Sequence, residues 1–436
     1  MSDIAAEPSG IKSRHVAAAV IGNALEFYDF TTYAYFATAI GQAFFPSGPH
    51  GFTSTPFGSL MASLAAFGAG FALRPIGGIV IGAYADRVGR RPAMMLSFLM
   101  MVLSIFGLAI VPTYAQIGVA APILAVLARL VQGFALGGEV GPTTAYLVEA
   151  APPHRRGLYA SWQSASQSVS SIVGGAVGVT LAMTLSEAHL DAYGWRIAFL
   201  IGAATLPFGL YIRRALPETL HQEDHLPDYD PQSLGLWRVL NDNARAILTG
   251  LAILAGGTVA TYALTYMTTF ARNTLHLPQS QSFSATLVNG IFGLTASLAG
   301  GYLADLYGRR RIMLVSRGAF FVAVMPLFLA IVHWRSASAL LAGVAILSVL
   351  LNISSGAFYG AFAESLPKRV RGMIFATVYA GAIALFGGTT QPLMAWMVHV
   401  TGDNLSPAYY LLLMTGVSLI AMFAAAETAP RAVKTP

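Results

Sequence analysis

The first apolar stretch of the chain carries polar and acidic side chains at helical spacing. Asn23, Glu26, Asp29, Phe30 and Tyr33 follow one another at intervals of one or three residues. A helix that turns 100° per residue therefore places them within a stripe of about 120°. Ionisable groups at membrane depth are costly, and they usually face an interior cavity or an ionic partner. The stripe is a candidate for proton transfer, and the alternative is an acid that only joins two helices.

A later apolar stretch carries the opposite charge. Arg129, Gln132 and Glu139 share one helical face with Thr143, and Arg129 lies roughly 15 Å along its helix from one end. A cation at that depth requires an anion, which is Asp29, Glu26 or a carboxylate substrate held by the planar guanidinium fork. Exchange between these partners would couple a proton to the substrate. The transported proton is assigned to Asp29, Glu26 or Glu139, and the choice among them stays open.

Further polar residues interrupt other apolar stretches. Arg74, directly before Pro75, is a second internal cation, for which structural pairing and ligand binding are equally open. Three stretches present neutral polar faces that suit either a water-filled path or hydrogen bonds between helices: Gln163, Gln167 and Ser170; Thr258, Thr261, Tyr262 and Thr265; and Asn352, Ser355 and Tyr359. The candidate substrate-binding residues are Arg129, Arg74, Asn23, Tyr33, Gln163, Gln167, Tyr262, Asn352 and Tyr359.

The elements that position these residues must be membrane helices. The chain has 436 residues, of which 56% are hydrophobic and 10% charged, whereas soluble domains are about 25% charged. Apolar stretches of roughly 20 residues span the hydrocarbon core, and the backbone there must satisfy its own hydrogen bonds. Twelve spans are expected, the first six at about 15–40, 57–84, 92–111, 118–148, 157–185 and 195–212, and the others starting near Ala244, Ser282, Ile312, Ala337, Gly372 and Pro407.

The chain contains one half-molecule twice. Residues 82–91 recur at 301–310 with six of ten residues identical, and Glu149, Pro152, Arg156 and Gly157 recur as Glu364, Pro367, Arg371 and Gly372. We therefore expect an N-terminal six-helix half (1–212), a polar cytoplasmic linker (213–242) and a C-terminal six-helix half (243–436). In the repeated loops an aspartate can meet an arginine or the positive N-terminus of a helix, which would suit a gate. The candidate gate residues are Asp86, Arg87, Arg90, Asp305, Arg309, Glu149, Arg156, Glu364 and Arg371.

Several site classes are excluded. The chain has no cysteine, which removes disulfides and thiolate metal sites, and no P-loop pattern occurs. His221 and His225 have metal-like spacing but lie in the acidic, proline-broken linker, so we expect no metal site. We expect no cofactor, and the expected coupling ion is H⁺.

The net charge of +6 is explained by membrane orientation. With a cytoplasmic N-terminus, 19 of the 25 basic residues fall at cytoplasmic ends and loops, as the positive-inside rule requires. We therefore expect a multi-pass protein of the inner membrane, with both termini cytoplasmic, a lipid bilayer around it, no nucleic-acid partner and a monomeric state. The six remaining basic residues are Arg74, Arg129, Arg196, Arg272, Arg317 and Arg335.

The repeated loop resembles the signature of the major facilitator superfamily, and the two-half layout extends the resemblance over the whole chain. Residues 22–29, 74–77, 129–133 and 137–139 are similar to its metabolite:proton symporter branch, and residues 162–167, 386–388 and 401–407 to the citrate symporters. The resemblance implies a substrate site between the halves and rocker-switch alternating access. It also implies proton coupling through Glu26, Asp29 and Arg129, and a cytoplasmic gate with Asp86 and Asp305. Leu306 replaces the arginine of the first loop, which implies a weaker second gating network.

The sequence thus predicts an all-α major facilitator fold and a proton-coupled symporter of a small carboxylate, citrate or a related tricarboxylate. The same fold could instead carry a dicarboxylate, oxoglutarate, shikimate or a zwitterion such as proline or betaine. A transport-inactive sensor is a second alternative, opposed by the intact internal charges. A membrane-embedded enzyme ranks last, because no nucleophile motif or histidine cluster is present.

Overall fold

The structure is a computed structural model that describes residues 13–88, 90–137, 144, 147, 148, 151–214, 241–367 and 371–429. Helices account for nearly all regular structure within these ranges, where one isolated β-bridge pairs Ser47 with Thr53. The all-α fold is therefore confirmed. Eight described helices are long and apolar enough to cross a membrane, and two shorter apolar helices accompany them. The full count of twelve spans stays a prediction.

The helices of the first half deviate from the expected spans at two places. The first span ends as α1 at Tyr35 and resumes as α2 after Phe36, and the second is interrupted at Leu73 because the ring of Pro75 disfavours a continuous helix there. The elements are α1 (Ser13–Tyr35), α2 (Ala37–Phe44), α3 (Pro56–Ala72), α4 (Arg74–Val88), α5 (Arg90–Ile110), α6 (Tyr114–Ile117), α7 (Ala120–Leu136), η1 (Pro153–Arg155), α9 (Arg156–Thr184), α10 (Glu187–His189), η2 (Leu190–Gly194) and α11 (Trp195–Arg214).

The helices of the second half begin within three residues of the expected starts. Residues 215–240, most of the expected linker with His221 and His225, lie outside the described residues. The elements are α13 (Ala244–Asn273), α14 (Gln279–Tyr307), α15 (Arg309–Trp334), α16 (Ala337–Ser365), α17 (Arg371–Ala382), η4 (Ile383–Gly387), α18 (Gly388–Thr401) and α19 (Ser406–Ala424).

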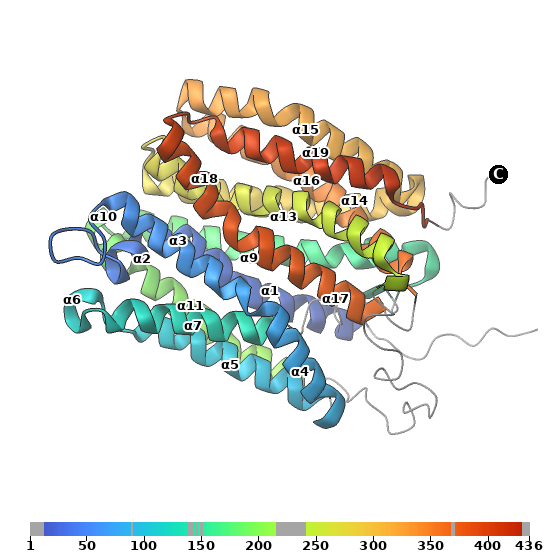
Figure 1. Cartoon of the computed structure of the whole chain (residues 1–436), viewed down its shortest axis with the longest axis horizontal. Helices are drawn as coiled ribbons and strands as arrows, with labels where there is room; N and C mark the ends of the chain where they lie inside the picture. The colour runs from blue at the N-terminus through green and yellow to red at the C-terminus, as the bar shows by residue number, and fades with distance from the viewer. Residues whose placement is uncertain are drawn as a thin grey trace, which may run out of the picture.

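The two halves lie side by side with their long helices roughly parallel (Figure 1). Helices α9 and α14 join them through glycines: a Cβ on Gly175 would stand 2.6 Å from the backbone nitrogen of Leu287, and one on Gly290 would stand 2.6 Å from that of Ile172. Small residues allow membrane helices to approach this closely. We call the end of the bundle where Gly308 joins α14 to α15 the Gly308 end, and the opposite end the far end.

Candidate functional site

A cavity of about 100 Å³ lies between the two halves. A single buried water needs roughly 10–15 Å³ on the same measure, so the space is sufficient for a small solute or several waters. Helices α1, α3 and α9 line it from the first half, and α13 to α17 with η4 from the second. Its wall is partly aromatic and partly polar without a described carboxylate. Four of the predicted substrate-binding residues line it: Gln167, Tyr262, Asn352 and Tyr359.

The other predicted substrate-binding residues are buried, but they are not among the residues that line the cavity. Asn23 and Gln163 join α1 to α9: the Gln163 side-chain amide donates to Asn23 Oδ1 at 3.2 Å, and Asn23 Nδ2 donates to Ser166 Oγ at 2.6 Å. The Tyr33 hydroxyl donates to the Ser63 carbonyl oxygen at 3.2 Å. These polar groups hold helices together in this conformation.

Asp29 and Arg129 form a buried ion pair directly behind the cavity. Arg129 Nη1 lies 3.0 Å from Asp29 Oδ2, and each side chain is 1% exposed. Gln132 bridges the pair by hydrogen bonds to both partners. The candidate anions for Arg129 were Asp29, Glu26 and a carboxylate substrate, and in the structure Arg129 pairs with Asp29. The side chains of Glu26 and Glu139 lie outside the described residues.

Aromatic rings separate this ion pair from the cavity. The Arg129 guanidinium lies 4.7 Å from the Phe30 ring centroid and 5.5 Å from that of Phe67, and both rings line the cavity. Arg74, 3% exposed, stands 4.7 Å from the rings of Phe30 and Phe71. No carboxylate of the described residues forms a salt bridge with Arg74. Cation–π contact of this kind partly offsets the loss of hydration.

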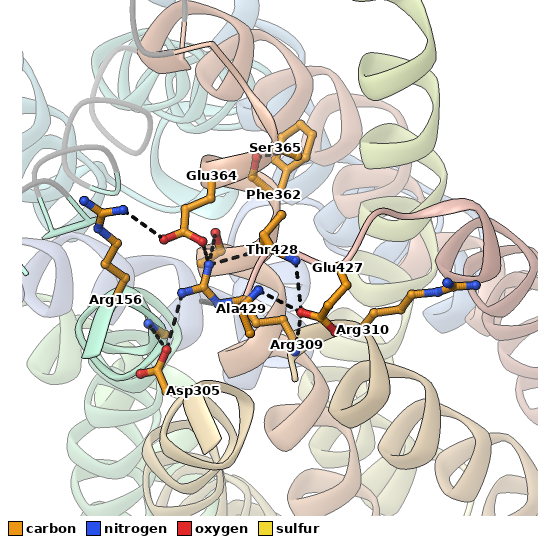
Figure 2. Close-up of polar contacts among 12 residues, drawn as sticks. Arg156, Asp305, Arg309, Arg310, Phe362, Glu364, Ser365, Glu427, Thr428 and Ala429 are labelled. Carbon is orange, nitrogen blue, oxygen red and sulfur yellow. Dashed lines mark hydrogen bonds and ion pairs between the residues drawn. The ribbon is translucent and has the colours of Figure 1, made fainter. Parts of the chain in front are cut away.

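At the Gly308 end, Asp305 connects the halves by capping α9. Its carboxylate accepts hydrogen bonds from the backbone N–H groups of Gly157 at 2.8 Å and Leu158 at 2.9 Å. Arg309 pairs with the same carboxylate at 3.3 Å (Figure 2). A carboxylate at a helix N-terminus satisfies free N–H groups and complements the helix dipole. We expected from the sequence that this aspartate could meet an arginine or a helix N-terminus, and in the structure it contacts both.

A second acid extends this contact. Glu364 pairs with Arg309 and also with Arg156 of the first half, at 3.5 Å (Figure 2). Arg371 donates to the Leu366 carbonyl at 3.4 Å. The remaining candidate gate groups, which are the side chains of Asp86, Arg87 and Arg90 and the residue Glu149, lie outside the described part of the chain. The comparison between the two loop networks therefore stays a prediction.

At the far end, a separate ion pair joins the halves. Arg272 Nη2 lies 2.9 Å from Asp191 Oδ1 and 2.7 Å from Oδ2, and the Gln279 side-chain amide donates to Asp191 Oδ1 at 3.0 Å. Asn273 also donates to Thr38 Oγ1 at 3.0 Å. Contacts between the halves thus lie at both ends of the bundle, on either side of the cavity.

The sequence pattern of the Major Facilitator Superfamily matches residues 19–389. The chain belongs to the major facilitator superfamily. It is 36% identical to a citrate-proton symporter of Klebsiella pneumoniae, over 89% of this chain and 86% of the relative. It is 30% identical to a proline/betaine transporter of Escherichia coli K12, over 100% of this chain and 87% of the relative.

The fold is also that of solved superfamily transporters. The xylose transporter XylE from E. coli, in a partially occluded inward-open conformation, matches with a TM-score of 0.74 at 16% identity, over 95% of this chain and 98% of the transporter. At that identity the likeness concerns the fold alone. It agrees with the observed architecture, in which two helical halves enclose a central cavity.

Three features of this superfamily member were not identified as functional from the sequence. Arg317 lines the cavity, whereas in the sequence it was only an arginine within an apolar stretch, without an assigned role. Glu427 accepts hydrogen bonds from the backbone nitrogens of Arg309 at 2.9 Å and Arg310 at 3.0 Å, and so caps α15 (Figure 2). The pair of Asp191 and Arg272 is the third. A lone arginine and acids near helix ends were visible signals, but their partners were not.

Proposed function

We propose that the protein is a secondary active transporter that carries a small carboxylate, citrate or a related tricarboxylate, together with H⁺ by alternating access. The observation that carries the proposal is the Asp29–Arg129 ion pair, buried behind the aromatic part of the wall of a cavity between the halves. The citrate-proton symporter relative supports the substrate class and the coupling ion. The proposed setting is the inner membrane with both termini cytoplasmic, as a monomer without a cofactor or nucleic-acid partner.

Asp29 is the proposed proton carrier because its carboxylate is buried and is stabilised by one described cation, Arg129. A buried cation is stable only while an anion compensates it. Protonation of Asp29 would neutralise the carboxylate and leave the Arg129 guanidinium without its partner, so a negative substrate in the adjacent cavity would be attracted. Release of the proton would return Arg129 to Asp29 and weaken the hold on substrate.

The two interhalf contacts are the proposed gates. Asp305 and Glu364 would hold the Gly308 end closed while the far end opens, and the pair of Asp191 and Arg272 would do the reverse. Each contact joins one half to the other, so neither can persist when the halves separate at its end. In the proposed orientation the Gly308 end is the cytoplasmic one.

A second candidate substrate is a zwitterion such as proline or betaine. The cavity wall includes the rings of Phe27, Phe30, Phe67 and Phe358, and such rings attract quaternary ammonium groups. The proline/betaine transporter relative, which aligns with the whole chain, supports this alternative. The absence of a described acid in the wall favours an anion over a zwitterion.

The test is uptake of labelled citrate by purified protein in liposomes, with an inward proton gradient and with that gradient collapsed by a protonophore. Accumulation that requires the gradient is expected. Uptake of labelled betaine that citrate does not inhibit, with no citrate uptake, would replace the first candidate by the second. A protein that moves none of these solutes nor a dicarboxylate would instead fit the sensor alternative.

A further inference from the structure

Arg317 is a buried cation that faces the central cavity. It belongs to α15, its side chain is 1% exposed, and it is the one charged side chain among the described residues that line the cavity. It lies eight residues after the start of α15 at Arg309, which corresponds to roughly 12 Å along the helix. Arg317 is therefore well inside the apolar layer, where a free cation is costly.

The described part of the protein offers Arg317 no anion. Its Nε donates to Ser354 Oγ at 3.3 Å, and its buried Nη1 has no hydrogen-bond partner. Arg129 and Arg309, which are equally buried, pair with Asp29 and Asp305. Arg74 also lacks a described carboxylate partner, but its guanidinium stands against the rings of Phe30 and Phe71, and Arg74 does not line the cavity. Arg317 thus keeps donor capacity for a group that the described protein does not supply.

The space beside the guanidinium is kept open by Gly257 on α13. A Cβ at this position would lie 3.5 Å from Arg317 Nη2, and Gly257 itself lines the cavity. Glycine weakens a helix by about 1 kcal/mol relative to alanine, so the absence of a side chain here gives the helix no benefit. A methyl group here would be in van der Waals contact with the guanidinium and would occupy part of the cavity beside it.

We propose that Arg317 is the carboxylate receptor of the second half, and that its fork binds one carboxylate of the transported substrate. This rests on the proposed function and names the group that recognises the substrate. Planar guanidinium and carboxylate groups form two parallel, charge-assisted hydrogen bonds. The other wall of the cavity carries Gln167, Ser164 and Ser168 of α9, so a bound anion would contact both halves at once.

In this assignment two arginines have different roles: Arg129 responds to the proton and Arg317 binds the substrate. Arg129 is paired with Asp29 behind Phe30 and Phe67 and would respond to the proton. Arg317 meets the cavity directly and stays charged throughout the cycle. A substrate with several carboxylates could engage Arg317 with one of them while another compensates Arg129 after Asp29 is protonated. A monocarboxylate could not do both.

The experiment is calorimetric binding to the purified full-length protein in detergent, with wild type and Arg317→Gln. The probes are citrate and citramalate, which is citrate with one carboxymethyl group replaced by methyl, and the panel also includes succinate and oxoglutarate. Loss of charge-assisted hydrogen bonds should weaken citrate binding by about 10- to 150-fold. The preference for citrate over citramalate should shrink in the variant, because Arg317 and the deleted carboxylate then no longer interact.

A purely structural role makes different predictions. It requires equal weakening of citrate and citramalate and a lower melting temperature in Arg317→Gln. If Arg317 is instead a substrate receptor with no anion of the protein beside it, the melting temperature of ligand-free Arg317→Gln should equal or exceed that of wild type. The substitution then removes an uncompensated buried charge. An equal loss for both ligands, or citrate binding as tight as that of wild type, overturns the assignment.

A steric pair of variants tests the same idea without changing charge. Gly257→Ala should weaken citrate binding while the protein stays folded, since alanine favours the helix. Gly318→Ala is the matched control, because Gly318 adjoins Arg317 and a Cβ there meets nothing within 4 Å. Equal citrate affinity of Gly257→Ala and Gly318→Ala would count against Arg317 as the carboxylate receptor.

The outcomes separate this inference from the proposed function. Citrate uptake by wild type with undiminished citrate binding in Arg317→Gln refutes the receptor alone. A wild type that binds another carboxylate of the panel but not citrate refutes citrate as the substrate, and loss of that ligand in Arg317→Gln still supports the receptor. A wild type that binds no member of the panel refutes both.

Discussion

Separate and joint neutralisation of Asp29 and Arg129 would measure how strongly the two charges depend on each other. Both side chains are 1% exposed, and Arg129 Nη1 lies 3.0 Å from Asp29 Oδ2. Asp29→Asn leaves the shape of the side chain nearly unchanged but removes the only described anion that pairs with Arg129. Arg129→Gln leaves the Asp29 carboxylate as the uncompensated charge.

The expected magnitudes follow from burial. Removal of one partner of a buried ion pair costs about 3–5 kcal/mol, because the other charge remains without compensation. Each single variant should lose about this much free energy of unfolding. Replacement of a whole buried pair by well-packed hydrophobic residues is often neutral or stabilising, because no charge is left unpaired. The double variant also leaves no charge unpaired but buries two amides, so it should lie within about 1–2 kcal/mol of wild type. The coupling energy is therefore expected to be several kcal/mol.

The stability assay is SDS-induced unfolding of the purified proteins, followed by helical circular dichroism. Ser104→Ala is a suitable control, because this hydroxyl donates only to the Ala128 carbonyl among the described contacts and its loss should cost about 1 kcal/mol. Destabilisation of the double variant by the sum of the two single effects would refute the reasoning, because additivity means that the charges do not compensate each other.

The same variants separate proton coupling from substrate movement. In liposomes, Asp29→Asn should lose accumulation driven by a proton gradient and retain counterflow exchange of citrate, because an amide cannot carry the proton. Arg129→Ala should abolish citrate binding, and Arg129→Lys should also impair it, since an ammonium lacks the bidentate fork. Gradient-driven accumulation by Asp29→Asn at the wild-type level would remove Asp29 from the coupling mechanism, and unchanged calorimetric affinity would remove Arg129 from binding.

Further predictions concern the gates and the packing of the halves. The chain lacks cysteine, so a single Ser168→Cys in the cavity reports access to an impermeant maleimide from either membrane side. Asp305→Asn should raise labelling from the Gly308 end severalfold, since it removes a charged helix cap and an ion pair; an unchanged rate would contradict a gating role. Asp191→Asn should raise labelling from the far end instead, and labelling from the same side in both variants would argue against two opposed gates. Gly175→Ala should reduce transport and stability by separating α9 from α14, whereas Gly107→Ala, where a Cβ meets nothing within 4 Å, should have no effect; equal stability of these two variants would show that the close approach is dispensable.

Local sequence features predicted the helices because each depends on properties within one stretch of chain. A membrane span requires only enough consecutive apolar residues, and starts near Ala244 and Ala337 are confirmed. The break at Leu73 follows from Pro75, a local signal that the expected continuous span overlooked. Candidate charges were equally visible, because an arginine or aspartate in an apolar stretch stands out without any partner in view.

The partner of each buried charge, and the helix faces that line the cavity, depended on packing between segments distant in the chain. Arg129 and Arg317 look alike in sequence, as single arginines within apolar stretches, yet one is neutralised by Asp29 and the other lines the cavity. Helical spacing defines which residues share a face, but the rotation of each helix against its neighbours decides what that face meets. Asn23 and Gln163 therefore join α1 to α9, although their spacing suited a substrate path equally well.

The sequence by itself determined the membrane-spanning class, the duplicated half and the few residues able to carry charge inside the bilayer, because hydropathy and repetition are properties of the chain alone. Only the tertiary structure decided that Asp305 caps α9 from 148 residues away, that aromatic rings screen the Asp29–Arg129 pair, and that Arg317 faces the cavity. Those contacts join segments far apart in the chain, and their geometry arises from the close packing of helices across the two halves.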